Sequence, residues 1–348
     1  MYIVTSIIKW VNHEWSDRKH LLANLLKYIN LPSASKHLII EGIAEESSEY
    51  TVVLIFGWFL TMSECFTEWY DLYTCQWNLG PKISGYDKKT SLVVQDRDFV
   101  YAFYILCTYK SVYRLDLSLR PLSWVETKSM YCQRSQLGVA ILNYWIYAVG
   151  GFDGNHELNK VEAFDVHTKE WKMVSSMSTN RANVSVGVLN HFLYAIGGFG
   201  GLSRQHLKSV ECYDPIVDRW TPIAEMYVSR SSPGVGVLNG QIYVIGEHDG
   251  QLSHKSVDVY NPKTKHWTSI TDIHVYCTNP GMSVVVLHDL LYVLGGRNEF
   301  NDDDSSVEIY NPYTDTWEYR ITSSSGFVNI NGGEVINKCP LFIKKSSI

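Results

Sequence analysis

Three arginines recur at one place in a repeated pattern and could bind acidic groups. Arg134, Arg181 and Arg230 each stand ten residues after a tryptophan. Lys88 fills the equivalent place in an earlier repeat, and Asn279 replaces the arginine in a later one. A guanidinium binds a carboxylate through two parallel hydrogen bonds, so a collar of arginines would capture an acidic peptide of a protein target. The alternative is that these arginines bond backbone carbonyls between neighbouring repeats.

Four variable loops between the repeated strands could contact the same partner. They read FDGNHELNK, FGGLSRQHLKS, EHDGQLSHKS and RNEFNDDDSS, and they differ in charge while the strands around them barely change. Loops on a rigid scaffold are common binding sites, and we expect three tyrosines to wall the site. The expected partner-binding residues are Lys88, Tyr131, Arg134, Phe152, Asp153, His156, Arg181, Phe199, Arg204, Tyr227, Arg230, His248, Asp249, Tyr276, Asn279, Arg297 and Asn298.

The sequence favours a protein that is not an enzyme and holds no metal or cofactor. Its 12 histidines are dispersed and never spaced as HxH or HExxH, and no GxSxG or phosphate-binding loop occurs. His156, His206 and His248 fall in three of the variable loops, so a metal site at which they converge is the alternative.

Composition narrows the class of partner. The 348 residues carry a net charge of −6, which lacks the basic excess that nucleic acid requires. The longest apolar run, Val52 to Leu60, is about half of the roughly 20 residues that a spanning helix needs. The N-terminus does not read as a secretory signal. The seven scattered cysteines are typical of reduced thiols in the cytoplasm.

A repeat of 47 to 50 residues organises most of the chain. Its copies end on six tryptophans, and the clearest ones begin with an apolar strand and a glycine pair, as in YAVGG, YAIGG and YVLGG. The closing tryptophans are Trp77, Trp124, Trp171, Trp220, Trp267 and Trp317. Short apolar runs broken by Gly, Asn and Asp predict four strands and no helix in each unit. Four-stranded units at this period predict an all-β, six-bladed β-propeller.

The recurrent aromatic residues fit this fold. An aromatic residue stands seven positions before the closing tryptophan in most units, and we expect both rings to pack between neighbouring blades. The aromatic residues concerned are Tyr70, Phe164, Tyr213, Tyr260 and Tyr310. Asn143, Asn190 and the pair Asn239-Gly240 should form tight turns, because these residues tolerate positive φ. The first unit lacks an innermost strand, which the segment SSSGFVNINGGEVINK would have to supply.

The paired glycines, the aromatic residue before the tryptophan and the arginine before the first strand resemble the kelch repeat over residues 52–317. Residues 1–47 have a helical period and look like part of a BACK domain, the helical linker of BTB-BACK-kelch proteins. We therefore expect a partial BACK segment at 1–47, a propeller at 48–336 and a tail at 337–348.

The resemblance also implies a function. In BTB-BACK-kelch proteins, the BTB domain dimerises the protein and, with BACK, docks on cullin-3, while the propeller reads the target for ubiquitination and degradation. This sequence lacks the BTB domain and part of BACK. It is expected to be the substrate-recognition receptor of a cullin-3-type ubiquitin ligase in the cytoplasm, with no membrane or nucleic-acid partner. The alternative is an actin-binding, cytoskeleton-associated kelch protein.

Overall fold

The regular elements of the described residues are β-strands, arranged as repeated antiparallel sheets. The computed structural model describes residues 51–58, 65–71, 76–81, 90–95, 99–104, 110–117, 122–202, 204–248, 253–274, 282–295, 306–321 and 329–337. The helical segment expected at 1–47 lies outside these residues. The domain division at 1–47, 48–336 and 337–348 therefore stays a prediction.

Six four-stranded sheets form the blades. Blade 1 holds β27 (Asn329–Asn337), β1 (Thr51–Trp58), β2 (Cys65–Asp71) and β3 (Gln76–Leu79); blade 2 holds β4 (Thr90–Gln95), β5 (Phe99–Tyr104), β6 (Val112–Asp116) and β7 (Trp124–Glu126). Blade 3 holds β8 (Gly138–Leu142), β9 (Trp145–Val149), β10 (Val161–Asp165) and β11 (Glu170–Val174); blade 4 holds β13 (Ser185–Leu189), β14 (Phe192–Ile196), β17 (Val210–Asp214) and β18 (Arg219–Ile223). Blade 5 holds β19 (Gly234–Leu238), β20 (Gln241–His248), β21 (Ser253–Asn261) and β22 (His266–Ile270); blade 6 holds β23 (Met282–Leu287), β24 (Leu290–Gly295), β25 (Ser306–Asn311) and β26 (Thr316–Ile321).

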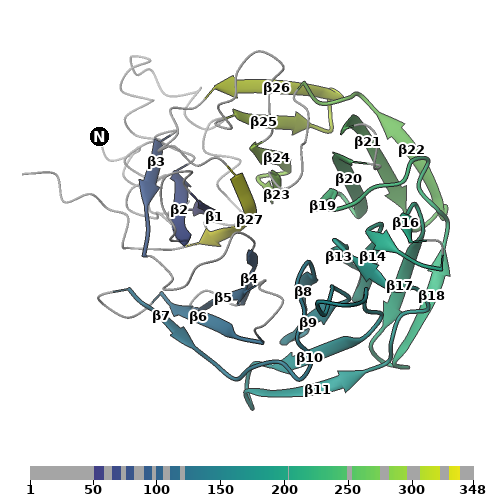
Figure 1. Cartoon of the computed structure of the whole chain (residues 1–348). Helices are drawn as coiled ribbons and strands as arrows, with labels where there is room; N and C mark the ends of the chain where they lie inside the picture. The colour runs from purple at the N-terminus through teal and green to yellow at the C-terminus, as the bar shows by residue number, and fades with distance from the viewer. Residues whose placement is uncertain are drawn as a thin grey trace, which may run out of the picture. The chain divides into compact units, whose positions relative to one another are not determined.

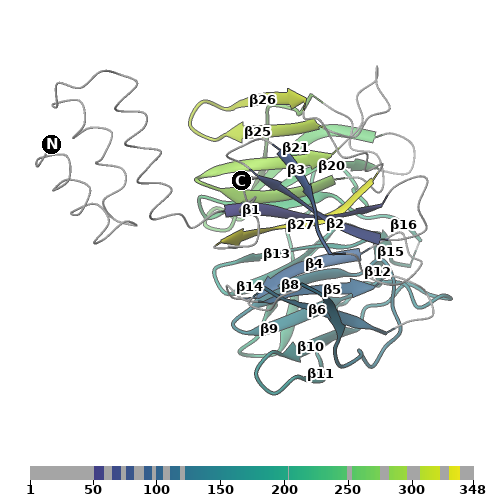
Figure 2. The ribbon, with the colours of Figure 1, turned by 90° about the vertical axis from the view of Figure 1, so that its left-hand side faces the viewer.

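The blades surround a common axis, with the first-named strand of each blade innermost (Figure 1). The expected six-bladed propeller is confirmed. A small additional sheet joins β12 (Arg181–Ala182), β15 (Phe199–Gly200) and β16 (Gln205–His206), and Figure 2 shows these three strands together at one end of the sheets. We call this end the loop face, because the described segments between second and third strands, 150–160, 197–202 and 204–209, lie there. The opposite end is the turn face.

Tight turns on the turn face join the first two strands of blades 3 to 6. Asn143, Asn190 and Asn239 have φ near +50°, and the residue after each also has positive φ. This is the conformation of a two-residue hairpin turn, and Asn and Gly adopt it at low cost. The turns predicted from the sequence are confirmed at all three positions.

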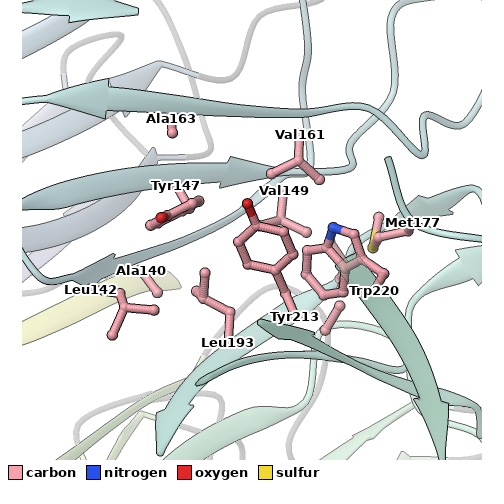
Figure 3. Close-up of a cluster of buried hydrophobic side chains, with 12 residues drawn as sticks. Ala140, Leu142, Tyr147, Val149, Val161, Ala163, Met177, Leu193, Tyr213 and Trp220 are labelled. Carbon is pink, nitrogen blue, oxygen red and sulfur yellow. The ribbon is translucent and has the colours of Figure 1, made fainter. Parts of the chain in front are cut away.

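Aromatic rings fill the seams between blades, as expected. On β17, Tyr213 lies directly opposite Trp220 of β18 in the strand register, which explains the seven-residue spacing in the sequence. The Tyr213 ring also meets Tyr147 of blade 3 with 5.7 Å between centroids, and all three rings are buried (Figure 3). The same second-strand to third-strand ring contact recurs between Tyr194 and Tyr260 at 6.1 Å. Burial of such large apolar areas holds each blade to the next.

The paired glycines allow two backbones to approach at these seams. Gly150 has φ +62°, and a Cβ atom built on it would lie 2.5 Å from the Arg181 carbonyl oxygen. The next residue, Gly151, donates its N–H to that same carbonyl at 2.7 Å. Gly198 donates to the Arg230 carbonyl in the following blade at 2.8 Å. Each pair therefore hydrogen-bonds the chain that enters the next blade, which only glycine permits at this distance.

Strand β27 supplies the innermost strand that blade 1 lacks. It lies beside β1 in the sheet, so residues distant in sequence complete one blade. Its Val335 packs against the buried cluster of blade 6, which includes Val285 and Leu294. The strand thus links the first and sixth blades. The propeller is closed by β27 from the segment SSSGFVNINGGEVINK, as the missing innermost strand of the first unit required.

Candidate functional site

The three recurrent arginines lie inside their blades, each paired with a carboxylate. Arg134 bonds Glu162 at 2.7 Å, and Arg181 bonds Glu211 at 3.0 Å. Arg230 forms the same pair with Asp258 at 3.0 Å. The three arginine side chains have no exposed surface, and the carboxylate side chains expose at most 2%. Each unit is a fully buried ion pair between an arginine that precedes the first strand and a carboxylate on the third strand of the same blade.

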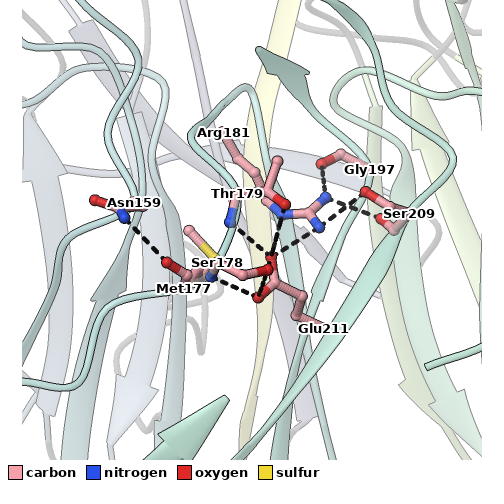
Figure 4. A network of polar contacts seen from close by, with 8 residues as sticks. All are labelled: Asn159, Met177, Ser178, Thr179, Arg181, Gly197, Ser209 and Glu211. Carbon is pink, nitrogen blue, oxygen red and sulfur yellow. Dashed lines mark hydrogen bonds and ion pairs between the residues drawn. The ribbon is translucent and has the colours of Figure 1, made fainter. Parts of the chain in front are cut away.

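The unit in blade 4 shows how this burial is compensated (Figure 4). Arg181 Nη1 donates to the carbonyls of Gly197 and Ser209 at 2.8 and 2.9 Å, and Nη2 donates to the Ser209 hydroxyl at 3.0 Å. Glu211 in turn accepts the backbone N–H of Ser178 at 2.7 Å. Burial lowers the pKa of Arg181, while the neighbouring Glu211 carboxylate opposes that shift. The pair ties a glycine pair, a third strand and the entering chain together.

An exposed arginine collar is therefore not formed by Arg134, Arg181 and Arg230. Their guanidinium groups bond backbone carbonyls and a buried carboxylate. The alternative from the sequence expected backbone carbonyls between neighbouring repeats, and it did not include the carboxylate. The carbonyls belong to the blade that each arginine enters; for Arg134 they are those of Gly150 and Lys160. Lys88 and Asn279, the other members of the expected collar, lie outside the described residues.

The expected tyrosine walls lie at the outer strands of the blades. Tyr131 is 51% exposed, yet its hydroxyl donates to the Trp171 carbonyl of β11 at 2.7 Å. Tyr227 is 63% exposed and donates to the Trp267 carbonyl of β22 at 2.6 Å. Each tyrosine lies in the segment that leads into a blade, and its hydroxyl bonds that segment to the outermost strand of the same blade. Tyr276 lies outside the described residues.

This geometry predicts a small stability effect for the tyrosine hydroxyl. Tyr227→Phe should reduce the free energy of unfolding by about 1 kcal/mol, because one interstrand hydrogen bond is lost. Tyr313→Phe is the control, since Tyr313 is 76% exposed at a turn, and it should change the same quantity by less than about 0.5 kcal/mol. Urea denaturation measures both. Equal stability of the two variants would contradict a stabilising role for this hydrogen bond.

Two of the variable loops are ordered against one another on the loop face. In blade 3, Phe152 exchanges backbone hydrogen bonds of 2.7 Å with Ser135. The Asp153 carboxylate accepts the backbone N–H of His156 at 2.8 Å, and the backbone donors of His156 and Asn155 lower the Asp153 pKa. His156 itself is exposed.

The blade 4 loop meets the blade 3 loop through an ion pair. Arg204, whose side chain is 65% exposed, lies 3.0 Å from Glu157 of the blade 3 loop. Phe199 is half-buried, and its ring contacts His206. Of the other expected loop residues, His248 ends strand β20, whereas Asp249, Arg297 and Asn298 lie outside the described residues. The Arg204–Glu157 ion pair thus joins the described loops of blades 3 and 4.

Sequence reasoning missed three residues at the loop-face end of the innermost strands. Gln136, Asn183 and Ser232 each follow a buried arginine by two positions and have φ of 55°, 51° and 54°. The Asn183 N–H donates to the Gln136 carbonyl and the Ser232 N–H donates to the Asn183 carbonyl, both at 2.8 Å. We call these three the mouth residues. In the sequence, their fixed position two residues after each arginine was the feature that could have identified them.

The described residues offer neither a metal site nor a membrane span. No three His, Cys, Asp or Glu side chains in the described ranges come together as a metal site requires. In the same ranges, no helix is long and apolar enough to cross a membrane. Cys132 and Cys212 are free thiols.

The fold and the repeats define a β-propeller of the kind that binds other proteins. The kelch motif matches residues 133–178, 180–227, 229–273 and 279–319, which together make up about half of the chain. The chain belongs to the kelch-repeat family. Among solved structures it is similar to the structure of YjhT, with 15% sequence identity and a TM-score of 0.58, over 68% of this chain and 84% of that one. This likeness shows the shared fold alone. No curated protein matches the sequence.

Proposed function

We propose that this propeller recognises a segment of a target protein on its loop face, centred on the mouth residues. The main support for this proposal is that backbone hydrogen bonds between Gln136, Asn183 and Ser232 link blades 3, 4 and 5. The side chains of these residues are half-buried. Their positive φ costs little for Asn183, but Gln136 and Ser232 adopt it at a cost. Strained backbone held by surrounding structure is typical of functional sites.

The chemistry of the mouth residues favours a neutral target group. Two side-chain amides and a hydroxyl can donate and accept hydrogen bonds but carry no charge. They suit a backbone turn or uncharged polar side chains. The acidic peptide expected from the arginines loses its support at this position, because those guanidinium groups are buried.

A pair of asparagine variants in blade 4 tests the mouth. Asn183 and Asn190 share φ +51° but lie at opposite faces of the same blade, so alanine at either position carries the same backbone cost. With a target protein isolated by affinity capture, Asn183→Ala should weaken binding about tenfold in calorimetry. Asn190→Ala should bind as the wild type does. Equal affinities of both variants would contradict the mouth as the binding site.

We further propose that target binding serves a cullin-3-type ubiquitin ligase in the cytoplasm, with no catalysis by this chain. Support comes from the kelch repeats and from the resemblance of residues 1–47 to a BACK segment. The kelch propeller is typically a non-catalytic interaction fold.

Three assays with purified proteins test the ligase assignment: cullin-3 binding, ubiquitination of the target and actin co-sedimentation. The chain should co-purify with cullin-3, and it should promote ubiquitination of the captured target. Co-sedimentation with actin filaments, together with failure to bind cullin-3, would contradict the ligase role and support the cytoskeletal alternative.

A further inference from the structure

The loop between the second and third strands of blade 4 contains a β-hairpin of its own. Strands β15 and β16 pair Phe199 with His206 and Gly200 with Gln205, and the rings of Phe199 and His206 lie 5.3 Å apart. At its base, the Leu207 N–H donates to the Gly198 carbonyl at 2.9 Å. Residues 199–202 and 204–206 are therefore held by a small sheet of their own, and we call them the blade 4 hairpin.

The described residues on either side of the tip of the blade 4 hairpin have defined backbone conformations and a backbone anchor. Gly200 and Gly201 have φ of 144° and 70°, and Arg204 also has positive φ at 48°. The Gly201 N–H donates to the Asn180 carbonyl at 3.0 Å, which anchors the tip to the segment that enters blade 4. A loop fixed in this way needs little ordering when a partner binds, so less binding free energy is lost.

Leu202 and Arg204, next to the tip, present an apolar side chain and a cation to solvent. Leu202 is exposed to 109% of its reference area, the highest value among the large hydrophobic residues described. Arg204 Nη2 donates to Glu157, which is only 9% exposed, and this bond orients the guanidinium while leaving most of it in solvent. An arginine has five N–H donors in a planar fork, so the remaining donors can bind a second carboxylate.

The equivalent loop in blade 3 provides an internal comparison. There the matching base hydrogen bond joins Leu158 to Gly151, which encloses two residues fewer than the bond between Leu207 and Gly198. Its tip carries Asn155 and His156 and is closed on itself by the Asp153 carboxylate. The two extra residues of blade 4 thus extend its loop, and Leu202 stands at a tip that in blade 3 carries Asn155 and His156.

We propose that the blade 4 hairpin is a contact element for a target peptide that carries an apolar side chain close to an acidic one. Leu202 packs against the apolar side chain, and Arg204, steadied by Glu157, binds the carboxylate. Leucine burial supplies affinity and the oriented guanidinium supplies selectivity. The inference rests on the proposed function, because it names the chemistry of a target bound on the loop face.

Selection from a phage-displayed library of random linear peptides tests the inference. The whole chain is immobilised as wild type, Leu202→Asn, Arg204→Gln and Ile216→Asn. The last is a matched control, because Ile216 is 92% exposed on a turn of the same blade at the turn face. Unchanged thermal melting midpoints establish that all variants are folded.

Wild type and Ile216→Asn should enrich peptides in which an apolar residue lies near Asp or Glu. Leu202→Asn should lose the apolar preference and Arg204→Gln the acidic one, and each should bind the leading wild-type peptide about tenfold more weakly. Peptides that bind both variants as tightly as the wild type overturn the inference.

A fifth selection, on Asn183→Ala, separates failure of this inference from failure of the proposed function. Peptides lost on Asn183→Ala but indifferent to Leu202 and Arg204 overturn the hairpin contact and leave the mouth in place. The reverse pattern supports the hairpin and contradicts the mouth. A wild-type selection that enriches no sequence contradicts both.

Discussion

Glu211→Ala should destabilise the propeller by about 3–5 kcal/mol, because it leaves Arg181 charged and unpaired in a site without solvent. Removing one partner of a buried pair exposes the full desolvation cost of the other. The double variant Arg181→Met with Glu211→Leu should recover much of the loss, since neither charge then remains. Urea denaturation of the three proteins gives the free energies of unfolding.

The same blade supplies a control for this experiment. Lys208 and Glu225 form an ion pair of 2.9 Å whose side chains are 56% and 51% exposed. Solvent screens such a pair, so Glu225→Ala should cost less than about 1 kcal/mol. If Glu211→Ala and Glu225→Ala were equally stable, the buried pairs would not hold the blades as described.

A second large effect is expected for Gly197→Ala, which should lower the free energy of unfolding by about 3 kcal/mol or more. Gly197 has φ +61°, and an added Cβ would meet the Arg230 carbonyl far inside van der Waals distance. That oxygen belongs to the backbone and already accepts the Gly198 N–H, so it cannot move away without breaking the seam. The left-handed conformation adds about 1–2 kcal/mol for a residue with a side chain.

Gly240→Ala separates these two contributions. Gly240 has φ +71°, but nothing lies within 4 Å of the added Cβ. Gly240→Ala should therefore lower the free energy of unfolding only by the cost of the left-handed backbone conformation, about 1–2 kcal/mol in thermal or chemical denaturation. Were the two alanine variants equally stable, close approach at the seam would not be the reason for the glycine pairs.

The repeat could be recognised in the sequence because the spacing between its aromatic residue and its tryptophan follows from strand register. Tyr213 and Trp220 face each other across one hairpin, so the distance between them in the sequence is fixed by the turn. The tight turns were equally readable, since Asn190 and Asn239 sit where positive φ is required. The closing strand β27 was harder, because it joins blade 1 through backbone pairing, which leaves little mark on side-chain identity.

The environment of the arginines could not be read in the same way. Arg181 and its partner Glu211 are 30 positions apart, and a guanidinium suits a buried network as well as an exposed peptide site. The recurrent acidic residue of the third strand was visible in the repeat, but only the folded blade shows that it lies beside the arginine. The mouth residues escaped notice because Gln136, Asn183 and Ser232 share a conformation and not a residue type.

Placement of β27 in blade 1 has a consequence for how the molecule is made. During synthesis, residues 51–79 leave the ribosome long before residues 329–337, so we expect blade 1 to lack its inner strand while the other sheets are made. That open edge has unpaired backbone groups and is a ready site for wrong pairing. Pairing of β27 with β1 removes this edge and links blades 1 and 6, so closure of the propeller depends on a single strand of nine residues.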